Sequence, residues 1–252
     1  MKIFFTLAIS LMLSIGMAQG QTTKTVGASG ANYSTLKAAF DAINTGAIKG
    51  AIILQITGST SETNTAALNA SGTLGSSYTS VTIFPTVTGK TISGNMAIPL
   101  IQLNGAANVT IDGRVDQTGV KNLVITNTNT GTGSSTIRFV NSAANNIVKY
   151  CTIKGSGTNS GGGVLLFSSS ASGNGNNNNI IDNNNITSDA AGRPCNAIFS
   201  SGSSGRENSG NIISNNTIYD FLSQDYSARG VNMLFQQVRA IMKCLFSHSL
   251  LE

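Results

Sequence analysis

NIVKYCTI (146–153), NIIDNNNI (179–186) and NIISNNTI (211–218) are three versions of one eight-residue segment, and they align without gaps. Their first residues lie 33 and 32 positions apart, and a weaker version, NVTIDGRV (108–115), begins 38 positions before the first of them. Other short apolar segments lie between the copies, at 136–140, 163–167 and 196–199. About three short strands per period predict a solenoid, because one such unit cannot bury its apolar face without stacked neighbours.

We therefore predict an all-β chain that forms a right-handed parallel β-helix (solenoid) with a short N-terminal capping helix. Stacking would pair equivalent strands in parallel at a spacing of about 4.8 Å. The register predicts two internal columns, one of Ile147, Ile180 and Ile212 and one of Ile153, Ile186 and Ile218. The alternative is an antiparallel sandwich of regular short strands, which gives no reason for one octet to recur.

Asparagine recurs at fixed places in the octet. We expect Asn146, Asn179 and Asn211 to stand in a turn, where Asn tolerates a left-handed φ and hydrogen-bonds along its own column. Two further pairs, Asn183 with Asn215 and Asn184 with Asn216, are expected to extend such ladders. Polar columns of this kind would supply the hydrogen-bonding surface that a chain with few charges otherwise lacks.

The part before the octets is less regular. Its strand candidates are 51–58, 80–84, 91–93, 100–103 and 123–126, with Pro85 and Pro99 at strand edges, where proline is tolerated. Ser34 and Thr35 can cap a helix in which Leu36, Ala39, Phe40 and Ile43 recur at helical spacing. We expect this helix, at about 34–46, to cover the first edge of the solenoid, because an open edge invites strand addition.

The two ends of the chain differ from its repetitive part. Residues 1–20 have the pattern of a signal peptide: Lys2, then an apolar stretch too short for a membrane span, then small residues at Ala18 and Gly20. A retained membrane anchor is the alternative. The predicted β-helix domain spans 21–228, in a secreted or cell-surface protein with no membrane span after signal cleavage. In 229–252 the Asn/Gly/Ser pattern is lost, which we interpret either as a helical cap or as a truncated or frame-shifted end.

Composition excludes some classes of function. Charged residues make up 10% of the chain, against about 25% in an ordinary domain. The formal net charge is +5, but much of the excess lies in the two atypical ends, and no basic stripe with interleaved aromatic residues occurs. We therefore expect no nucleic-acid binding. Cys151 and Cys195 fall at different phases of the repeat, so we predict no structural disulfide and place Cys151 on a strand.

One segment carries a family resemblance. GASGANYSTLKAAFDAI (27–43) resembles the opening of pectin-lyase-like β-helix proteins, in which a Gly-Ser-Gly turn and a Tyr/Phe-x-Thr-Ile step lead into the capping helix. TIDG (110–113) is similar to a turn of these solenoids. The stretch from about Thr25 to Phe221 resembles the repetitive exported β-helix proteins of Bacteroidetes. That resemblance implies a segment of a larger surface protein, such as an adhesin, with a C-terminal sorting domain.

The catalytic groups of that fold family are not recognisable in the sequence. Pectin methylesterases, polygalacturonases and pectate lyases carry paired or clustered Asp residues with particular Arg, Gln, His or other basic partners. Glycosidic hydrolysis needs one carboxyl group to donate a proton and another to activate water. This chain has no adjacent acidic pair, and its one histidine, His248, lies in the atypical tail. We predict no catalytic residue, no cofactor and no metal.

Six charged residues remain as candidates for glycan contact. Asp112 and Asp116 flank Arg114, and an ion pair that stabilises a turn fits them better than a Ca²⁺ site, which needs six or more oxygens. Lys149 and Asp182 share a register position, so on neighbouring coils they are expected to form a solvated pair worth under about 1 kcal/mol. Arg138 alternates with Ile137 and Phe139 and is expected to point outward.

Aromatic residues offer a second possibility for sugar contact. A stacking platform of Tyr150, Phe167, Phe199, Tyr219 and Phe221 is one interpretation, and packing in the core is the one we favour, because aromatic residues at strand positions usually pack. The leading hypothesis is a non-enzymatic extracellular β-helix with a structural, adhesive or glycan-contacting role. The alternative, a polysaccharide lyase or glycoside hydrolase of the pectin-lyase-like fold, rests on fold analogy.

Overall fold

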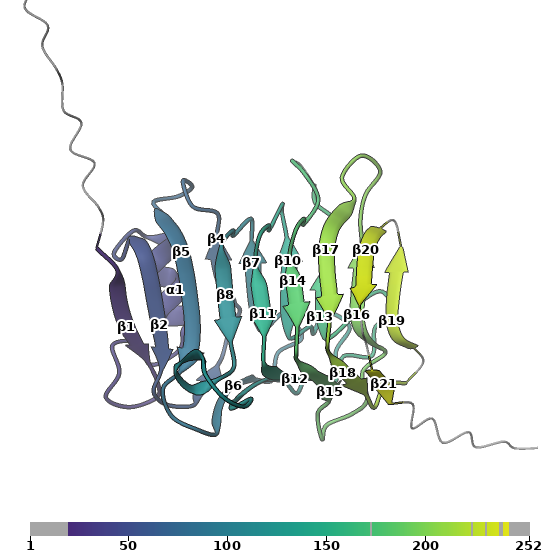
Figure 1. Ribbon diagram of the computed structural model, residues 1–252, viewed down its shortest axis with the longest axis horizontal. Coiled ribbons are helices and arrows are strands. Elements are labelled where there is room, and N and C mark those ends of the chain that lie inside the picture. The colour runs from purple at the N-terminus through teal and green to yellow at the C-terminus, as the bar shows by residue number, and fades with distance from the viewer. Residues whose placement is uncertain (1–19, 172, 223, 230, 237–238, 242–252) are drawn as a thin grey trace, which may run out of the picture.

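The computed structural model describes residues 20–171, 173–222, 224–229, 231–236 and 239–241. Its strands wind into a stack of coils in which each coil contributes to three parallel sheets (Figure 1). The predicted all-β, right-handed parallel β-helix with one short N-terminal helix is confirmed. The predicted signal peptide lies, apart from Gly20, outside the described residues.

Each sheet runs the length of the solenoid, in chain order. Sheet A contains β1 (Thr22–Val26), β2 (Gly50–Ile56), β5 (Tyr78–Pro85), β8 (Val109–Asp112), β11 (Ile147–Lys149), β14 (Ile180–Asp182), β17 (Asn208–Ser214) and β20 (Val231–Gln236). Sheet B contains β3 (Thr60–Glu62), β6 (Lys90–Gly94), β9 (Leu123–Asn127), β12 (Cys151–Gly155), β15 (Asn185–Ser188), β18 (Thr217–Tyr219) and β21 (Arg239–Ile241). Sheet C contains β4 (Ala66–Asn69), β7 (Ile101–Asn104), β10 (Ile137–Val140), β13 (Leu165–Phe167), β16 (Asn196–Ser201) and β19 (Gln224–Arg229).

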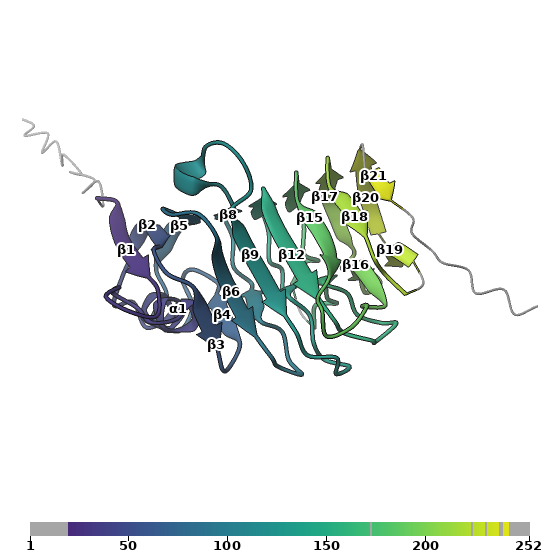
Figure 2. The same ribbon diagram turned by 90° about the horizontal axis from the view of Figure 1, so that it is seen from below.

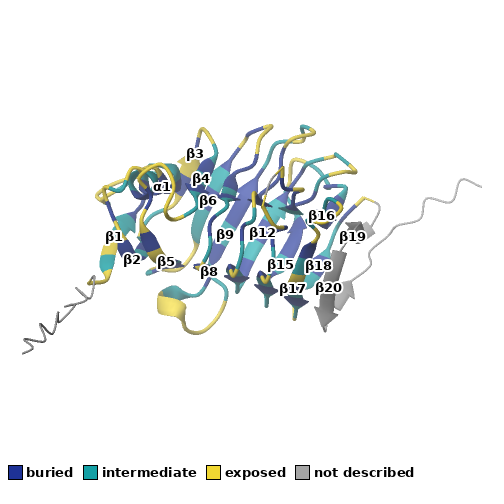
Figure 3. Cartoon of the chain, turned by 90° about the horizontal axis from the view of Figure 1, so that it is seen from above, coloured by how far each residue is buried: buried dark blue, intermediate teal, exposed yellow. Residues whose placement is uncertain are grey.

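The core is a set of aliphatic columns that run along the stack. The buried positions recur from strand to strand, in dark blue in Figure 3. In sheet B, Ile153, Ile186 and Ile218 pair in register and are fully buried, as predicted. In sheet A the prediction was wrong by one residue. Ile147, Ile180 and Ile212 do form a column, but they lie half-buried on the outer face, and the buried column contains their neighbours Val148, Ile181 and Ile213.

The inward-pointing asparagines explain that error. Asn146, Asn179 and Asn211 are fully buried, so strand alternation sends the following isoleucine outward. Asn179 Oδ1 accepts hydrogen bonds from the backbone N and the Nδ2 of Asn146, at 3.1 and 2.9 Å. Asn211 Oδ1 accepts the same two bonds from Asn179, at 2.9 and 3.0 Å. The predicted ladder is confirmed, but the left-handed φ belongs to the preceding residues, such as Asn145 and Asn178, both at 57°.

The second predicted ladder is confirmed in part. Asn184 is fully buried and donates to Asn216 Oδ1 through its backbone N at 2.8 Å and through Nδ2 at 3.1 Å. Asn183 and Asn215 do not bond to one another in the described contacts. They hold the left-handed turn, both with φ 54°, and both donate to the carboxylate of Asp182.

A third buried ladder was not predicted from the sequence. Asn176 donates to Asn208 Oδ1 through its backbone N at 2.8 Å and through Nδ2 at 2.9 Å. Both side chains are buried beside the turn between sheets C and A. The segment around Asn176 contains five Asn residues among seven, so the sequence offers no local apolar pattern to tell which of them points inward.

Helix α1 (Leu36–Asn44) covers the first coil at the N-terminal end, as expected. Thr35 caps it through a 3.1 Å bond from the backbone N of Ala38. A second anchor was not anticipated: the buried carboxylate of Glu62, on β3, accepts bonds from the backbone N of Leu36 and Lys37 at 2.9 and 3.0 Å. A carboxylate at a helix N-terminus satisfies free N–H groups and interacts favourably with the helix dipole, so Glu62 fixes α1 to the sheet.

The strand candidates upstream of the octets are confirmed as β2, β5, β6, β7 and β9, with bounds that shift by one or two residues. In the tail, Val231–Gln236 and Arg239–Ile241 form β20 and β21, which continue sheets A and B. The helical cap predicted for 229–252 is therefore wrong over these residues, whose backbone pairs as two further strands. Residues 242–252 lie outside the described residues.

Candidate functional site

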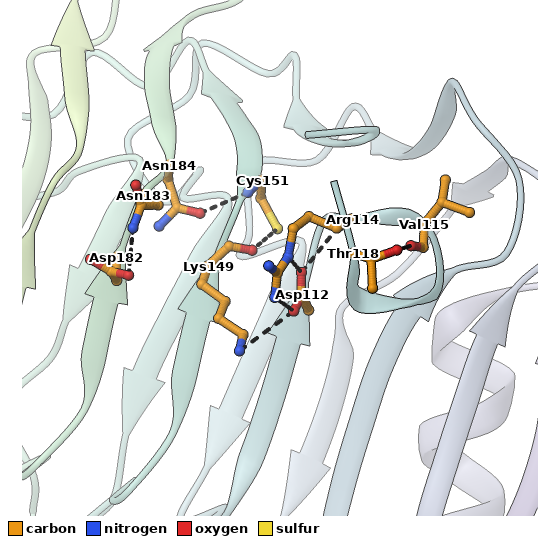
Figure 4. A network of polar contacts seen from close by, with 9 residues as sticks. All are labelled: Asp112, Arg114, Val115, Thr118, Lys149, Cys151, Asp182, Asn183 and Asn184. Carbon is orange, nitrogen blue, oxygen red and sulfur yellow. Dashed lines mark hydrogen bonds and ion pairs between the residues drawn. The ribbon is translucent and has the colours of Figure 1, made fainter. Parts of the chain in front are cut away.

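Four of the six candidate residues gather where sheet A turns toward sheet B (Figure 4). Asp112, Lys149 and Asp182 occupy one outward-facing column of sheet A, because β8, β11 and β14 pair in register at these positions. Arg114 follows β8 by two residues and reaches back over the column. This group, Asp112, Arg114, Lys149 and Asp182, is called the charged column below.

Asp112 is the centre of the charged column. Its side chain has no exposed surface, and its two oxygens accept bonds from Arg114 Nε at 2.9 Å and Nη2 at 2.7 Å. Lys149 Nζ lies 3.5 Å from Asp112 Oδ2. Burial raises the pKa of Asp112, but the hydrogen bonds and charges of Arg114, with the charge of Lys149, outweigh burial and leave that pKa below its usual value. The predicted Asp112–Arg114 pair is present.

Lys149 and Asp182 are register partners, as predicted, but the pairing differs from the prediction. The ion pair that Lys149 makes in the described structure is with Asp112 on the preceding coil. Asp182 instead accepts bonds from Ser214 Oγ at 2.7 Å and Asn215 Nδ2 at 2.9 Å. Burial raises the pKa of Asp182, but these bonds, that from Asn183 and the Lys149 charge lower it overall. Short polar side chains on the next coil satisfy this carboxylate without Lys149.

Tyr150 lies beside the charged column in a strained conformation. Its φ is 53°, in the region that Asn183 and Asn215 occupy on the next two coils. A bulky residue there costs of the order of 1 kcal/mol more than Asn or Gly. The guanidinium carbon of Arg114 lies 4.0 Å from the centre of the Tyr150 ring, so a cation–π contact offsets part of that strain.

The coil that contains Arg114 also carries the longest insertion between octets. Residues 113–122 form a loop, with the 3₁₀ turn η1 (Val115–Gln117), that projects from the solenoid beside β8 (Figure 2). Gly113, the first residue of the loop, lies close to the backbone of Tyr150: a Cβ at position 113 would be 2.1 Å from the Tyr150 backbone O. Arg114 therefore ties the base of the inserted loop to the sheet.

The other two candidates lie apart from the charged column. Asp116 is exposed in η1, with φ 46°, and Arg114 pairs with Asp112 and not with Asp116. Arg138 lies half-buried on the outer face of sheet C, as predicted, and donates through Nε to Ser168 Oγ at 2.7 Å. Burial lowers the pKa of Arg138. The six candidates thus do not form a single surface.

Two further polar contacts were not predicted from the sequence. Thr126 Oγ1 donates to Asp189 Oδ2 at 2.7 Å, although 63 residues separate them. Arg193 Nε lies 2.8 Å from Asp220 Oδ1, and Ser188 also donates to Asp220. The acidic groups come from turns outside the octets, whose spacing varies, so the repeat register gave no signal for them.

The aromatic candidates do not form a stacking platform. Phe167 is fully buried and stacks on Phe139, with ring centres 4.5 Å apart, and Phe199 and Phe221 are also buried. Tyr150 and Tyr219 are half-buried. Cys151 is buried on β12, and burial, the largest cause, raises the pKa of its thiol far above the usual value, so it is not a nucleophile at neutral pH.

Most carboxylates of the charged column and of its neighbouring turns are engaged by the protein itself. Asp112, Asp182, Asp189, Asp220 and Glu62 each accept at least one hydrogen bond or ion pair from the protein itself. A general acid needs a carboxyl group with a raised pKa, whereas Asp112 and Asp182 have lowered ones. Within the described ranges, no three His, Cys, Asp or Glu side chains are grouped as metal ligands.

Comparison with known proteins adds little to this geometry. No family model matches the chain, and no curated protein matches it. Two solved structures of the pectin methylesterase from Aspergillus niger, one penultimately deglycosylated and one deglycosylated, are similar at 13% and 14% identity with TM-scores of 0.36 and 0.34. Each comparison covers 86% of this chain and 84% of the other. The Bacteroidetes relation stays a prediction.

Proposed function

We propose that the chain is part of a secreted or cell-surface protein and acts as a non-catalytic β-helix scaffold that contacts extracellular polysaccharide. The observation that carries the proposal is the state of Asp112. Its side chain has no exposed surface and is paired with Arg114 and Lys149, which lower its pKa, so this carboxylate stabilises the charged column. The signal-peptide pattern of residues 1–20 supports export, and no helix of the described residues is long and apolar enough to cross a membrane.

The charged column also supplies the exposed groups that a glycan could meet. Arg114 and Lys149 keep 19% and 28% of their side-chain surface exposed beside Asp112, and the half-buried Tyr150 ring lies under the Arg114 guanidinium group. Hydrogen-bond donors next to an aromatic ring suit the hydroxyl and carboxylate groups of a polysaccharide. Arg138, on sheet C, and Asp116, in the loop, are proposed as separate and weaker points of contact.

Affinity electrophoresis of the purified exported chain in gels that contain a panel of acidic and neutral polysaccharides tests this proposal. We expect at least one polysaccharide to retard migration, and Lys149→Gln to weaken that retardation about fivefold, the effect of losing a contact worth about 1 kcal/mol. Lys37→Gln on α1 is the matched control, because it removes the same charge far along the stack. No retardation by any polysaccharide, or equal loss with both variants, would count against the proposal.

A further inference from the structure

The N-terminal end of the solenoid is closed unevenly. Over sheets B and C, α1 packs against β3 and β4, the first strands of those sheets, and Glu62 holds the helix in place. Sheet A begins one coil earlier, with β1, at the outer end of the stack (Figure 1). The edge of β1 is therefore the part of this end that a strand from another molecule could reach.

Half of that edge is already occupied. The segment that follows β1 turns back, so Tyr33 N donates to Thr25 O at 3.1 Å and Gly27 N donates to Tyr33 O at 3.0 Å. Asn32 Oδ1 accepts from Thr25 N at 2.9 Å. Among the described residues, no such backbone segment lies along the outer edge of 22–24. An unpaired strand edge of this kind is a template for edge-to-edge association.

The side chains of 22–24 oppose that association. Lys24 pairs with Leu54, which begins a buried aliphatic column of sheet A that continues through Ile83, Ile111, Val148, Ile181 and Ile213. Lys24 thus stands on the inward face, where each sheet A strand from β2 to β17 has an aliphatic residue. Thr22 likewise precedes the buried Ile52 in the neighbouring column.

Space for the lysine exists because no coil of the described residues lies beyond β1. Lys24 and Thr22 line an open cavity of about 580 Å³ together with Lys49 and the 46–48 connection after α1. Another coil stacked on β1 would cover this cavity and bury the ammonium group of Lys24 against its own aliphatic column. Burying an unpaired charge in an apolar environment is strongly unfavourable.

We propose that Lys24 blocks the N-terminal edge, so that a strand of a second copy of this chain cannot extend sheet A from β1. Lys24 stands where an aliphatic residue would expose an apolar end of the column, to which a second copy could bind. The effect of Lys24 comes from the inward position of its charge and not from the net charge of the chain. Removing the charge of Lys49, in the same cavity, should therefore have no such effect.

Sedimentation velocity of the purified exported chain, over a 100-fold range of concentration, tests the proposal with three variants. Lys24→Leu completes the aliphatic column, and we expect it to self-associate at a concentration at least tenfold lower than the unmodified chain. Lys49→Leu removes the same charge from the same cavity, but from an exposed position outside the column, and should behave as the unmodified chain does. Lys24→Glu keeps an inward charge of opposite sign and should also not associate.

Far-UV circular dichroism and the melting temperature establish that each variant is folded. Equal association of Lys24→Leu and Lys49→Leu would overturn the proposal, because loss of charge alone would then explain it. Association of Lys24→Glu at the concentration found for Lys24→Leu would overturn it as well. If Lys24→Leu does not fold, Lys24→Met is measured against Lys49→Met with the same expected difference.

Discussion

Removal of the Asn179 side chain tests whether the buried ladder stabilises the stack. The Asn179 amide makes four hydrogen bonds: it donates to Ala143 O and Asn211 Oδ1, both at 3.0 Å, and it accepts two from Asn146. In Asn179→Ala the four partner atoms lose these bonds at buried positions. The backbone N of Asn146 suffers most, since its bond to Asn179 Oδ1 is the contact that the structure gives it.

The magnitude follows from the number of bonds. Each buried hydrogen bond contributes about 1 kcal/mol net, and a buried donor left without a partner costs about 1–3 kcal/mol. We expect Asn179→Ala to lower the free energy of unfolding by about 4 kcal/mol, a large part of the 5–15 kcal/mol typical of a folded domain. With a urea slope of about 2 kcal/mol/M, the unfolding midpoint should fall by about 2 M.

Urea unfolding followed by far-UV circular dichroism measures this change, and Asn174→Ala is the matched control. Asn174 is exposed and lies five positions away, and its described hydrogen bonds involve its backbone alone. The urea midpoint of Asn174→Ala should therefore move by less than about 0.3 M, the shift that a change of about 0.5 kcal/mol produces. Equal midpoints for the two variants would refute the idea that the ladder holds the coils together. The stack would then depend on the aliphatic columns alone.

Three further variants test the cap, the charged column and the inserted loop. Glu62→Gln keeps one acceptor for α1 and loses the charge, so thermal unfolding should show a free energy of unfolding lower by about 2 kcal/mol. The control Asp41→Asn, at an exposed position, should lower it by under about 0.5 kcal/mol. Equal losses would show that the bonds from α1 to Glu62 do not stabilise the fold. The folded-state pKa of Asp112 is lowered, so its stabilisation is complete above the unfolded value of about 4 and is lost as pH falls through the folded pKa. Asp112→Asn removes one partner of a buried ion pair, so it should cost about 3 kcal/mol at pH 7. It should also flatten the fall in stability below pH 4, and an unchanged acid profile would contradict this assignment. Gly113→Ala should lower the free energy of unfolding by at least about 3 kcal/mol, because the added Cβ overlaps the backbone of Tyr150. Gly192→Ala, where the nearest atom would be 3.6 Å from the Cβ, should lower it by under about 1 kcal/mol. Similar melting temperatures for the two variants would contradict the close approach at Gly113.

The repeat made the fold predictable because the same octet must present the same face on every coil. The pairing of Ile153 with Ile186 and Ile218 followed from sequence spacing alone, and so did the Asn184–Asn216 ladder. The inward face of sheet A was assigned wrongly because hydrophobicity favoured Ile147 over Asn146. An amide whose hydrogen bonds are all made to equivalent amides loses little free energy on burial. Composition alone does not reveal which asparagines have such partners.

The candidate site was predictable only where it follows the repeat. Lys149 and Asp182 were placed in one column correctly, but which carboxylate Lys149 approaches depended on the local partners of Asp182, which come from Ser214 and Asn215. Contacts of loop residues such as Asp189 lie outside the period, so register gave no information about them. The inward-facing position of Lys24 was equally hidden, because β1 precedes the first recognisable octet.

The claim that this β-helix binds and does not cleave is tested most directly by a search for products. The purified exported chain is incubated with pectins of high and low methyl ester content and with other plant and algal polysaccharides, and methanol, new reducing ends and unsaturated products are measured. The account predicts no release above a heat-denatured control by a chain that circular dichroism shows to be folded and β-rich. Release of any of these products, lost on heating, would contradict it and direct attention to the exposed Asp116 and the loop of residues 113–122.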